Sequence, residues 1–347
     1  MGDSRADRAF IGSFTSAGGR GIVVAEVDAA TGALTEAGGS DAVADPSYLA
    51  AGAGGTVLYA VSETSDGAVA AFDTAGPGLR PIGPPVPVAG DGPTHLALAQ
   101  GRLLTANYGS GSVSVLGLGP DGAPRGTPFL LRHTGEGPDR DRQREPHAHQ
   151  VLPDPSGRWV LGVDLGTDSV RVCALDPVSG ELRVHRETAL RPGSGPRHLV
   201  FHPGGRHVCV LGELDPAVTL CRWDAATGEL EPVAEIPLVA EGAEGLAYPS
   251  ELAVSPDGRR LWVAVRGQDT IAVLELDEGF EKGELVATVP CGGHWPRDLV
   301  LDPGGRRLYV ANERSGDVTW FDLDPATGLP HRGGSLPVPA VSCVLFA

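Results

Sequence analysis

The chain has 347 residues, with 44 acidic and 27 basic side chains and a formal net charge of −17. This charge argues against a surface for nucleic acid or for an anionic membrane, because both need a basic footprint. Fifty glycines and thirty prolines stand at intervals between apolar runs, which is typical of the turns of an all-β protein.

The start of the chain shows no apolar leader region, and no run approaches the roughly 18 apolar residues of a membrane span. The five cysteines have no C-x-x-C spacing, so we expect buried reduced thiols rather than a disulfide framework or a zinc site. We therefore predict a soluble cytoplasmic protein, a monomer or weak homodimer, that needs no cofactor and no metal.

Along the chain, residues 1–7 are expected to be disordered. Three strands are predicted next, over residues 9–14, 21–27 and 34–36, with a turn at residues 28–32. They form three quarters of a four-stranded unit, and its first strand is missing at this end of the chain.

A segment opened by proline then recurs six times, about 50 residues apart, which is the period of propeller blades. The copy that opens Gly-Pro-Arg-His predicts strands over residues 198–202, 207–214, 218–223 and 230–234, and four antiparallel strands make one blade. The copies begin at Pro46, Pro93, Pro146, Pro196, Pro249 and Pro296.

The last predicted strand covers residues 339–346 and supplies the strand that the N-terminal unit lacks. Pairing the two termini in one blade closes the ring and removes its open edges. We therefore predict a single all-β domain over residues 1–347, a seven-bladed β-propeller with four antiparallel strands per blade.

Polar residues gather on one face of this ring. In an antiparallel blade the start of the first strand and the end of the second lie on the same face, whereas the turn between them lies on the other. The charged residues at these places differ between blades, and loops on a rigid scaffold often carry function. We expect substrate-binding side chains here, namely His198, Arg297, Asn107, Glu251 and Asp164, although Glu251 could instead pair with an arginine.

Five segments carry a resemblance to a known family. Residues 142–149 read Arg-Gln-Arg-Glu-Pro-His-Ala-His, residues 195–198 Gly-Pro-Arg-His and residues 212–215 Gly-Glu-Leu-Asp. Together with residues 107–113 and 265–267, they are similar to the seven-bladed lactonase family. That family includes propeller-type 6-phosphogluconolactonases and fungal carboxy-cis,cis-muconate cyclases, and the resemblance extends from Phe10 to Phe346.

The resemblance implies four acting positions. They are a histidine of the His-x-His element (His147 or His149), Arg197, Glu213 and Arg266, with His149 favoured because it begins the inner strand. Two neighbours depart from the family pattern, because Gly212 and Val265 stand where the family has asparagine.

These residue types suit the opening of a lactone. Histidine titrates near neutral pH and can act as base or acid. Arginine binds anionic groups through a planar fork and stabilises developing negative charge. We therefore predict a metal-independent lactonase for a small anionic sugar lactone, above all 6-phosphogluconolactone, with catalytic His149, His147, Glu213 and Arg197 and substrate-binding Arg266.

Three alternatives stay open at this point. The first is a lactone-forming cyclase of the muconate type, or an enzyme for a secondary metabolite, since the same parts serve both directions. The second is a non-catalytic scaffold. The third is a calcium-dependent lactonase that uses carboxylates and amides around the channel (Glu63, Asp164, Asn107 and Asn312). The charged stretch of residues 135–145 is a candidate lid.

Overall fold

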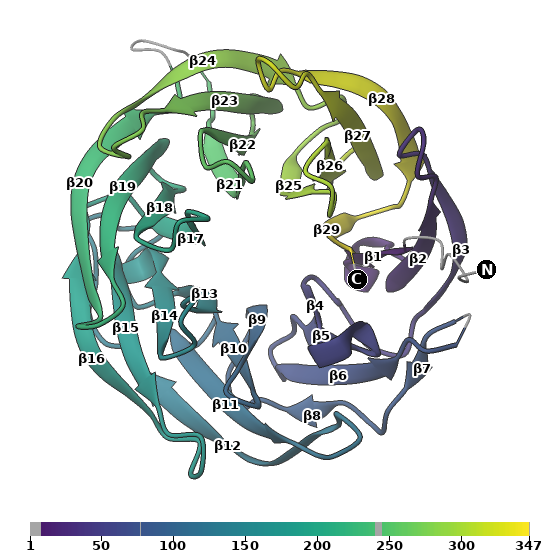
Figure 1. Cartoon of the computed structure of the whole chain (residues 1–347). Coiled ribbons are helices and arrows are strands. Elements are labelled where there is room, and N and C mark those ends of the chain that lie inside the picture. Colours follow the sequence, from purple (N-terminus) through teal and green to yellow (C-terminus); the bar gives the residue numbers. More distant parts are fainter. Residues whose placement is uncertain (1–7, 77, 240–244, 347) are drawn as a thin grey trace.

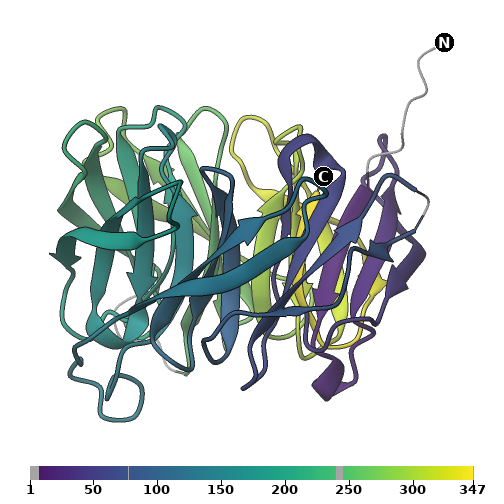
Figure 2. The ribbon, with the colours of Figure 1, turned by 90° about the horizontal axis from the view of Figure 1, so that it is seen from below.

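The structure, a computed structural model, describes residues 8–76, 78–239 and 245–346. Residues 1–7, expected to be disordered, lie outside this part of the chain. Seven antiparallel sheets stand around a central axis (Figure 1), and an edge-on view shows a disc with loops on both faces (Figure 2). The predicted seven-bladed propeller is confirmed, and no helix of the described residues is long and apolar enough to cross a membrane.

Seven first strands surround the axis, one in each blade, and seven second strands pair with them. Apolar runs fill these positions because both of their faces are buried against neighbouring blades. Blades 1 to 7 have the first strands β29 (Val341–Phe346), β4 (Leu49–Ala51), β9 (Pro93–Ala99), β13 (Ala148–Pro153), β17 (Pro196–Phe201), β21 (Tyr248–Val254) and β25 (Pro296–Leu301). The second strands are β1 (Arg8–Ser13), β5 (Val57–Ser62), β10 (Arg102–Asn107), β14 (Trp159–Asp164), β18 (His207–Gly212), β22 (Arg260–Arg266) and β26 (Arg307–Asn312).

The third strands are still mostly buried, whereas the fourth strands at the rim are the most exposed. The third strands are β2 (Ile22–Val27), β6 (Ala68–Asp73), β11 (Ser112–Leu118), β15 (Ser169–Leu175), β19 (Ala217–Asp224), β23 (Thr270–Leu276) and β27 (Asp317–Leu323). The fourth strands are β3 (Leu34–Ser40), β7 (Arg80–Pro81) with β8 (Val86–Pro87), β12 (Pro124–Arg132), β16 (Leu182–Ala189), β20 (Glu229–Pro237), β24 (Gly283–Pro290) and β28 (Pro330–Pro337). Three short 3-10 turns complete the described elements: η1 (Thr15–Ala17), η2 (Ala53–Gly55) and η3 (Leu165–Thr167).

The two ends of the chain close the ring as predicted. Strand β29 pairs antiparallel with β1, and Leu345 lies opposite Phe10. Figure 1 shows the C-terminal strand at the axis beside the N-terminal blade. The first blade is thus held by backbone hydrogen bonds between the two ends of the sequence.

Neighbouring blades are held by apolar contact and by a repeated hydrogen bond. Leu220 of blade 5 packs in one buried cluster with Leu261 and Val263 of blade 6. At one equivalent position of three second strands, an aromatic side chain donates a hydrogen bond to a carbonyl of the next blade. These bonds, all of 2.8 Å, are Tyr59 to Gly122, Trp262 to Gly328 and Tyr309 to Gly32.

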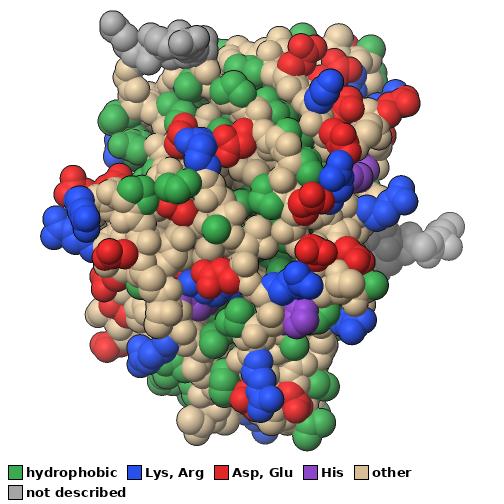
Figure 3. All heavy atoms as spheres, turned by 90° about the vertical axis from the view of Figure 1, so that its left-hand side faces the viewer, with side chains coloured by type: hydrophobic (Ala, Val, Ile, Leu, Met, Phe, Trp, Pro, Cys, Tyr) green, Lys and Arg blue, Asp and Glu red, His purple; other side chains and the backbone are tan. Residues whose placement is uncertain are grey.

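The outer rim carries interspersed charges of both signs (Figure 3). Arg191, for example, pairs with Asp215 and Glu235, and Arg222 pairs with Glu231 and Glu281. Exposed pairs of this kind contribute little to stability but keep the surface soluble.

A sharp backbone turn precedes the first strand in five blades. The residue at this place has a left-handed conformation, with φ of 45° at Asp45, 57° at Gly92, 56° at Gly195, 63° at Trp295 and 51° at Ala340. Its carbonyl accepts a hydrogen bond from the residue after the second strand, as Gly195 does from Glu213 at 2.8 Å. The turn therefore joins the starts of first strands to the ends of second strands on one face of the disc.

Replacing Gly195 by alanine should destabilise the protein by more than backbone strain alone. A Cβ atom at this position would meet Leu214 Cγ at 2.4 Å, whereas one at Gly205, also at positive φ, would meet nothing within 4 Å. Gly205→Ala is expected to cost about 1 kcal/mol, and Gly195→Ala more, as measured by urea unfolding. Equal losses in the two variants would contradict the close approach at Gly195.

Candidate active site at the channel mouth

A β-bulge opens the first strand in six of the seven blades. The pairing with the second strand skips one residue there; in blade 5, Pro196 pairs with Gly212 and His198 with Leu211. A bulge leaves the extra residue unpaired and re-aims its side chain. The bulged residues are Thr94, His149, Arg197, Ser250, Arg297 and Ser342.

The register of blade 4 corrects the position of one repeat. The sequence repeat was aligned on Pro146, but Ala148 pairs with Asp164 as Pro196 pairs with Gly212. His149 therefore occupies the place of Arg197, and His147 precedes the strand. Residues two apart in a regular strand point to the same side, but His147 lies outside the strand and His149 is in the bulge, so this rule does not apply to the two rings.

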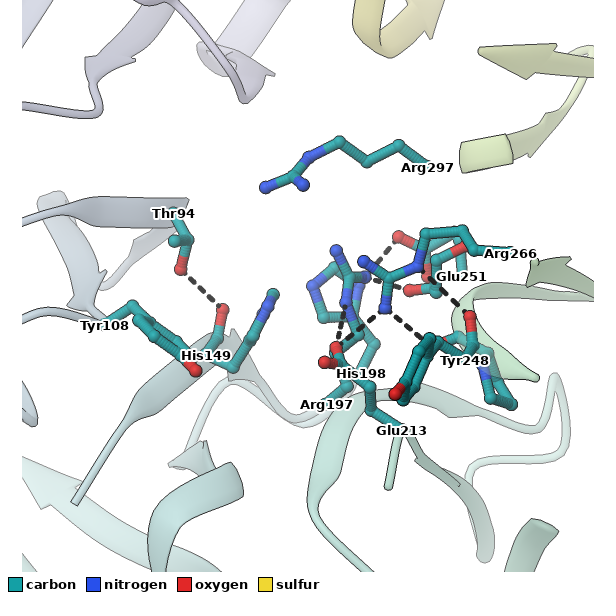
Figure 4. A network of polar contacts seen from close by, with 12 residues as sticks. Thr94, Tyr108, His149, Arg197, His198, Glu213, Tyr248, Glu251, Arg266 and Arg297 are labelled. Atoms are coloured by element: carbon teal, nitrogen blue, oxygen red, sulfur yellow. Dashed lines mark hydrogen bonds and ion pairs between the residues drawn. The ribbon is translucent and has the colours of Figure 1, made fainter. Parts of the chain in front are cut away.

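The bulged side chains and their neighbours enclose a narrow cavity on the axis (Figure 4). Its volume of about 10 Å³ admits the centre of about one water molecule. Five predicted site residues line it: His149, Arg197, His198, Arg297 and Glu251. Glu63, named above for the calcium-dependent alternative, also lines it, and the structure adds Ser47, Tyr48, Thr94, Asp298 and Ser342.

Glu213 lies beside this cavity in a clamp of three arginines. Its carboxylate is 2.7 Å from Arg142 Nη2, 2.8 Å from Arg266 Nη2 and 3.2 Å from Arg197 Nε. Burial alone would raise the pKa of Glu213, but the nearby guanidinium groups, Arg266 first, lower it to about 2. The carboxylate is therefore ionised at neutral pH and holds three cations in place.

Arg142 comes from the predicted lid, and no sequence pattern predicted its contact with Glu213. The side chain of its neighbour Gln143 is buried and donates hydrogen bonds to the Leu165 carbonyl at 2.8 Å and to Asp168 at 2.7 Å. This segment is thus fastened to blade 4, while Arg142 reaches across to blade 5.

His149 and His198 each have a buried ring nitrogen with no hydrogen-bond partner, namely His149 Nδ1 and His198 Nε2. Their ring centroids are 5.1 Å apart. Burial, reinforced by the positive charge of Arg197, lowers the pKa of both rings well below the ordinary histidine value. Both imidazoles are therefore neutral at neutral pH and able to accept a proton.

His147 does not line the cavity. Its ring stacks on Tyr108 with centroids 4.4 Å apart, and its Nδ1 lies 2.9 Å from the Tyr108 carbonyl oxygen. Tyr108 in turn meets the His149 ring edge-on at 5.5 Å. The geometry thus gives His147 contact with a neighbour of His149 rather than with the cavity.

Asn107 and Asp164 turn into their blades rather than into the cavity. Asn107 bonds Ser112 and Ser114, at 3.1 and 2.8 Å, and Asp164 bonds His133 and Arg171, at 2.6 and 3.1 Å. Because Asp164, His133 and Arg171 are all buried and bonded to one another, we do not expect them to contact a substrate. Both residues end a second strand and are opposite the residue that precedes the bulge.

Gly212 and Val265 occupy this same second-strand position in blades 5 and 6. A Cβ atom at Gly212 would meet the Asp215 carbonyl at 2.7 Å and that of Ser194 at 2.9 Å. The equivalent Asn107 side chain bonds within its own blade rather than lining the cavity. We therefore expect the absence of asparagine at these two places to change contacts within the blade and not contacts with the substrate.

Arg297 comes from blade 7, which is next to the blade of Arg266, and contacts two acidic groups. Its guanidinium is 3.3 Å from Glu313 and 3.7 Å from Glu63, and it covers the Phe14 ring at 4.9 Å. Burial raises the pKa of Glu63, which is partly offset by Arg297. Among the residues with described side chains, no group of three or more His, Cys, Asp or Glu is arranged to hold a metal ion.

Glu213→Gln should remove a pH-dependent contribution to stability. The folded pKa of about 2 is below the ordinary 4.5, so the carboxylate stabilises the fold fully above pH 4.5 and loses this effect as the pH falls toward 2. The shift corresponds to about 3 kcal/mol at neutral pH. Urea unfolding should show a difference between wild type and variant that shrinks on acidification, whereas Glu231→Gln on the rim should show little difference at any pH.

Comparison with known proteins places the chain in a family. The sequence profile described as "Lactonase, 7-bladed beta-propeller" matches residues 8–346. The 6-phosphogluconolactonase of Bacillus subtilis is 32% identical, with 97% of each chain covered. The periplasmic gluconolactonase of Pseudomonas aeruginosa superposes with a TM-score of 0.90 at 28% identity, covering 98% of this chain and 99% of the other.

A crystal structure from Lactobacillus plantarum gives a TM-score of 0.92 at 28% identity and covers 99% of both chains. These matches agree in fold, extent and blade number with the ring described above. The chain is a member of the seven-bladed β-propeller lactonase family.

Proposed function

We propose that the protein hydrolyses a small anionic sugar lactone, specifically 6-phosphogluconolactone, at the mouth of the cavity lined by the bulged side chains. The carrying observation is that neutral His149 and the cationic Arg197 and Arg297 converge on a space for one water molecule. The substrate is suggested by the B. subtilis relative and by the arginine-rich mouth.

In this proposal His149 activates the water. Its neutral imidazole accepts a proton from the water as the oxygen attacks the lactone carbonyl carbon, which is general base catalysis. The C–O bond to the ring oxygen then breaks, and that oxygen takes up a proton as it leaves. The lowered pKa of His149 keeps the base unprotonated before attack, although it also weakens its drive for the proton.

Arg197 and Arg297 stabilise the negative charge that develops on the carbonyl oxygen. Burial lowers the pKa of Arg197 to about 10, which still leaves the guanidinium charged at neutral pH. Arg266 and the half-exposed Arg142 lie farther out, around Glu213, and we assign them to the anionic tail of the substrate.

Glu213, predicted from the sequence as a catalytic residue, has a positioning role in this scheme. A carboxylate with a pKa of about 2 is a weak base at neutral pH. The role of Glu213 is to hold the guanidinium groups of Arg142, Arg197 and Arg266 close together. Asn107 and Asp164 stabilise their own blades, and His147 holds Tyr108 in place. We therefore expect none of the three to contact the substrate.

A cytoplasmic location belongs to the same proposal. All five cysteines are buried and unpaired, as is usual in a reducing compartment. The P. aeruginosa relative is described as periplasmic, and cell fractionation would decide the location of this protein.

Hydrolysis of 6-phosphogluconolactone by the purified protein, followed against its spontaneous rate, tests the assignment directly. The activity should persist in the presence of a chelator. A rate no faster than the spontaneous one would remove this substrate, and formation of a lactone from a muconate would favour the cyclase alternative.

His149→Asn should lower kcat by about a hundredfold or more, since it removes the base. His147→Asn should change kcat by less than tenfold, because His147 contacts Tyr108 rather than the cavity. Steady-state kinetics of the two variants compare the two histidines under matched chemistry. A larger loss in His147→Asn would reverse the assignment.

A further inference from the structure

Two buried carboxyl groups lie directly beneath the catalytic cavity. Glu251 of β21 and Asp298 of β25 are both buried, line the same cavity and interact electrostatically. Glu251 Oε2 is 2.7 Å from His198 Nδ1, and the Leu252 backbone N–H donates to Glu251 Oε1 at 3.0 Å. Asp298 accepts the Val344 N–H at 2.7 Å.

The surroundings of this pair favour a shared proton near neutral pH. Burial raises the pKa of both groups, and for Asp298 the neighbouring charge of Glu251 raises it further. Two adjacent buried carboxylates cannot both be ionised without strong repulsion. The groups that face the pair are Arg197 and His198 from β17, Tyr48 before β4, and Cys343 from β29, and only Arg197 among them is cationic.

Other groups of the cavity are poor proton donors. His149 and His198 carry no extra proton, because burial and Arg197 lower their pKa values. Arginine does not release a proton in this pH range. Glu63 is the one rival, because burial raises its pKa, but Arg297 lies 3.7 Å away and favours its ionised form.

His198 connects the carboxyl pair to the cavity. Its Nδ1 faces Glu251, and its buried Nε2 has no protein partner while the residue lines the cavity. Figure 4 shows the His198 ring between Glu251 and the cavity side chains. If a carboxyl proton is directed at Nδ1, the neutral ring carries its own proton on Nε2 and presents it as a donor.

We propose that Glu251 and Asp298 are the proton reservoir of the site and that His198 is the general acid that protonates the leaving ring oxygen. This inference rests on the lactone hydrolysis proposed above. It assigns to His198 a catalytic role, and to the two carboxyl groups a positioning role behind it.

The proton balance closes over one turnover. His149 takes a proton from water as the C–O bond forms. As the bond to the ring oxygen breaks, that oxygen takes the Nε2 proton of His198, and Nδ1 takes the proton shared by the carboxyl pair. A water between the two rings then returns the proton from His149 to Nε2, and Nδ1 gives its proton back to the pair. The product acid loses its own proton to solvent.

A second cavity lies on the other side of the pair. It has a volume of about 370 Å³ and is lined mainly by apolar residues from farther along the first strands, such as Leu199, Leu252 and Val344. Tyr48, Glu251 and Asp298 line both cavities and therefore form the wall between them. Solvent on the opposite face can thus equilibrate with the shared proton without passing the substrate.

The test combines a measurement on the resting protein with kinetics. Infrared spectra of the full chain at neutral pH should show a protonated carboxyl band that Glu251→Gln and Asp298→Asn each remove. Both variants should lower kcat on the sugar lactone by about a hundredfold, the range of general acid catalysis, with KM changed less than threefold. An aryl-ester lactone, whose phenolate leaves without a proton, should lose less than tenfold.

The outcomes distinguish a failure of the proposed lactone hydrolysis from a failure of the proposed proton reservoir. If wild type does not hydrolyse the lactone, the proposed function fails, and the infrared band still decides whether the pair holds a proton. The reservoir is overturned if no such band exists, if the variants retain kcat, if both lactones lose rate equally, or if Glu63→Gln shows the selective loss instead. Should Glu251→Gln fold poorly, Asp298→Asn decides alone, because its amide oxygen can still accept the Val344 N–H.

Discussion

The unpaired residue at the start of each inner strand determines what the channel of this propeller presents. Regular pairing would point alternate side chains of a strand into the sides of the neighbouring blades, where the space is apolar. The bulge turns one additional side chain per blade toward the axis. Six blades share the device. A histidine, two arginines and two hydroxyl groups therefore line one cavity, although they come from positions about 50 residues apart in sequence. The sixth bulged residue, Ser250, instead donates a hydrogen bond to the Pro296 carbonyl. The closed ring, sealed by β29 against β1, keeps this convergence rigid.

The acidic residues of the site divide by environment into two kinds. Glu213 sits among three guanidinium groups, and its pKa falls to about 2, so it serves as a fixed negative charge. Glu251 and Asp298 lie against each other with Arg197 as their nearest cation, and burial raises their pKa values. Acidic side chains thus have two roles here: Glu213 holds the arginines in place, and Glu251 with Asp298 is proposed to hold a proton. Different pKa values for neighbouring acidic groups are typical of acid–base sites.

Sequence alone predicted the blade number and the ring closure because turn prolines and glycines repeat at fixed intervals, and each blade satisfies the same local rules. It also predicted that first-strand starts and second-strand ends meet on one face, since strand direction determines which ends meet. Side-chain direction was harder to predict. Alignment of the blade 4 repeat on Pro146 was displaced by two residues and put His147 at the place of Arg197, whereas the pairing of Ala148 with Asp164 gives that place to His149. Asn107 and Asp164 end second strands on this face, yet they turn inward to serine, histidine and arginine partners that no sequence pattern predicts. Glu63 was found because it follows its second strand at the same place as Glu213, whereas the contact of Arg142 with Glu213 depends on how neighbouring blades meet.

The proposed function places the opening of the lactone at the cavity where the bulged strand starts meet. A crystal structure with 6-phosphogluconate, the product of the proposed reaction, would locate this step. We predict that the product carboxylate contacts Arg197 and Arg297, with His149 and His198 within hydrogen-bonding distance of the reacting atoms and the phosphate toward Arg142 and Arg266. Product bound in the cavity on the opposite face, or at the mouth without contact to Arg197 and Arg297, would show that the lactone is opened elsewhere.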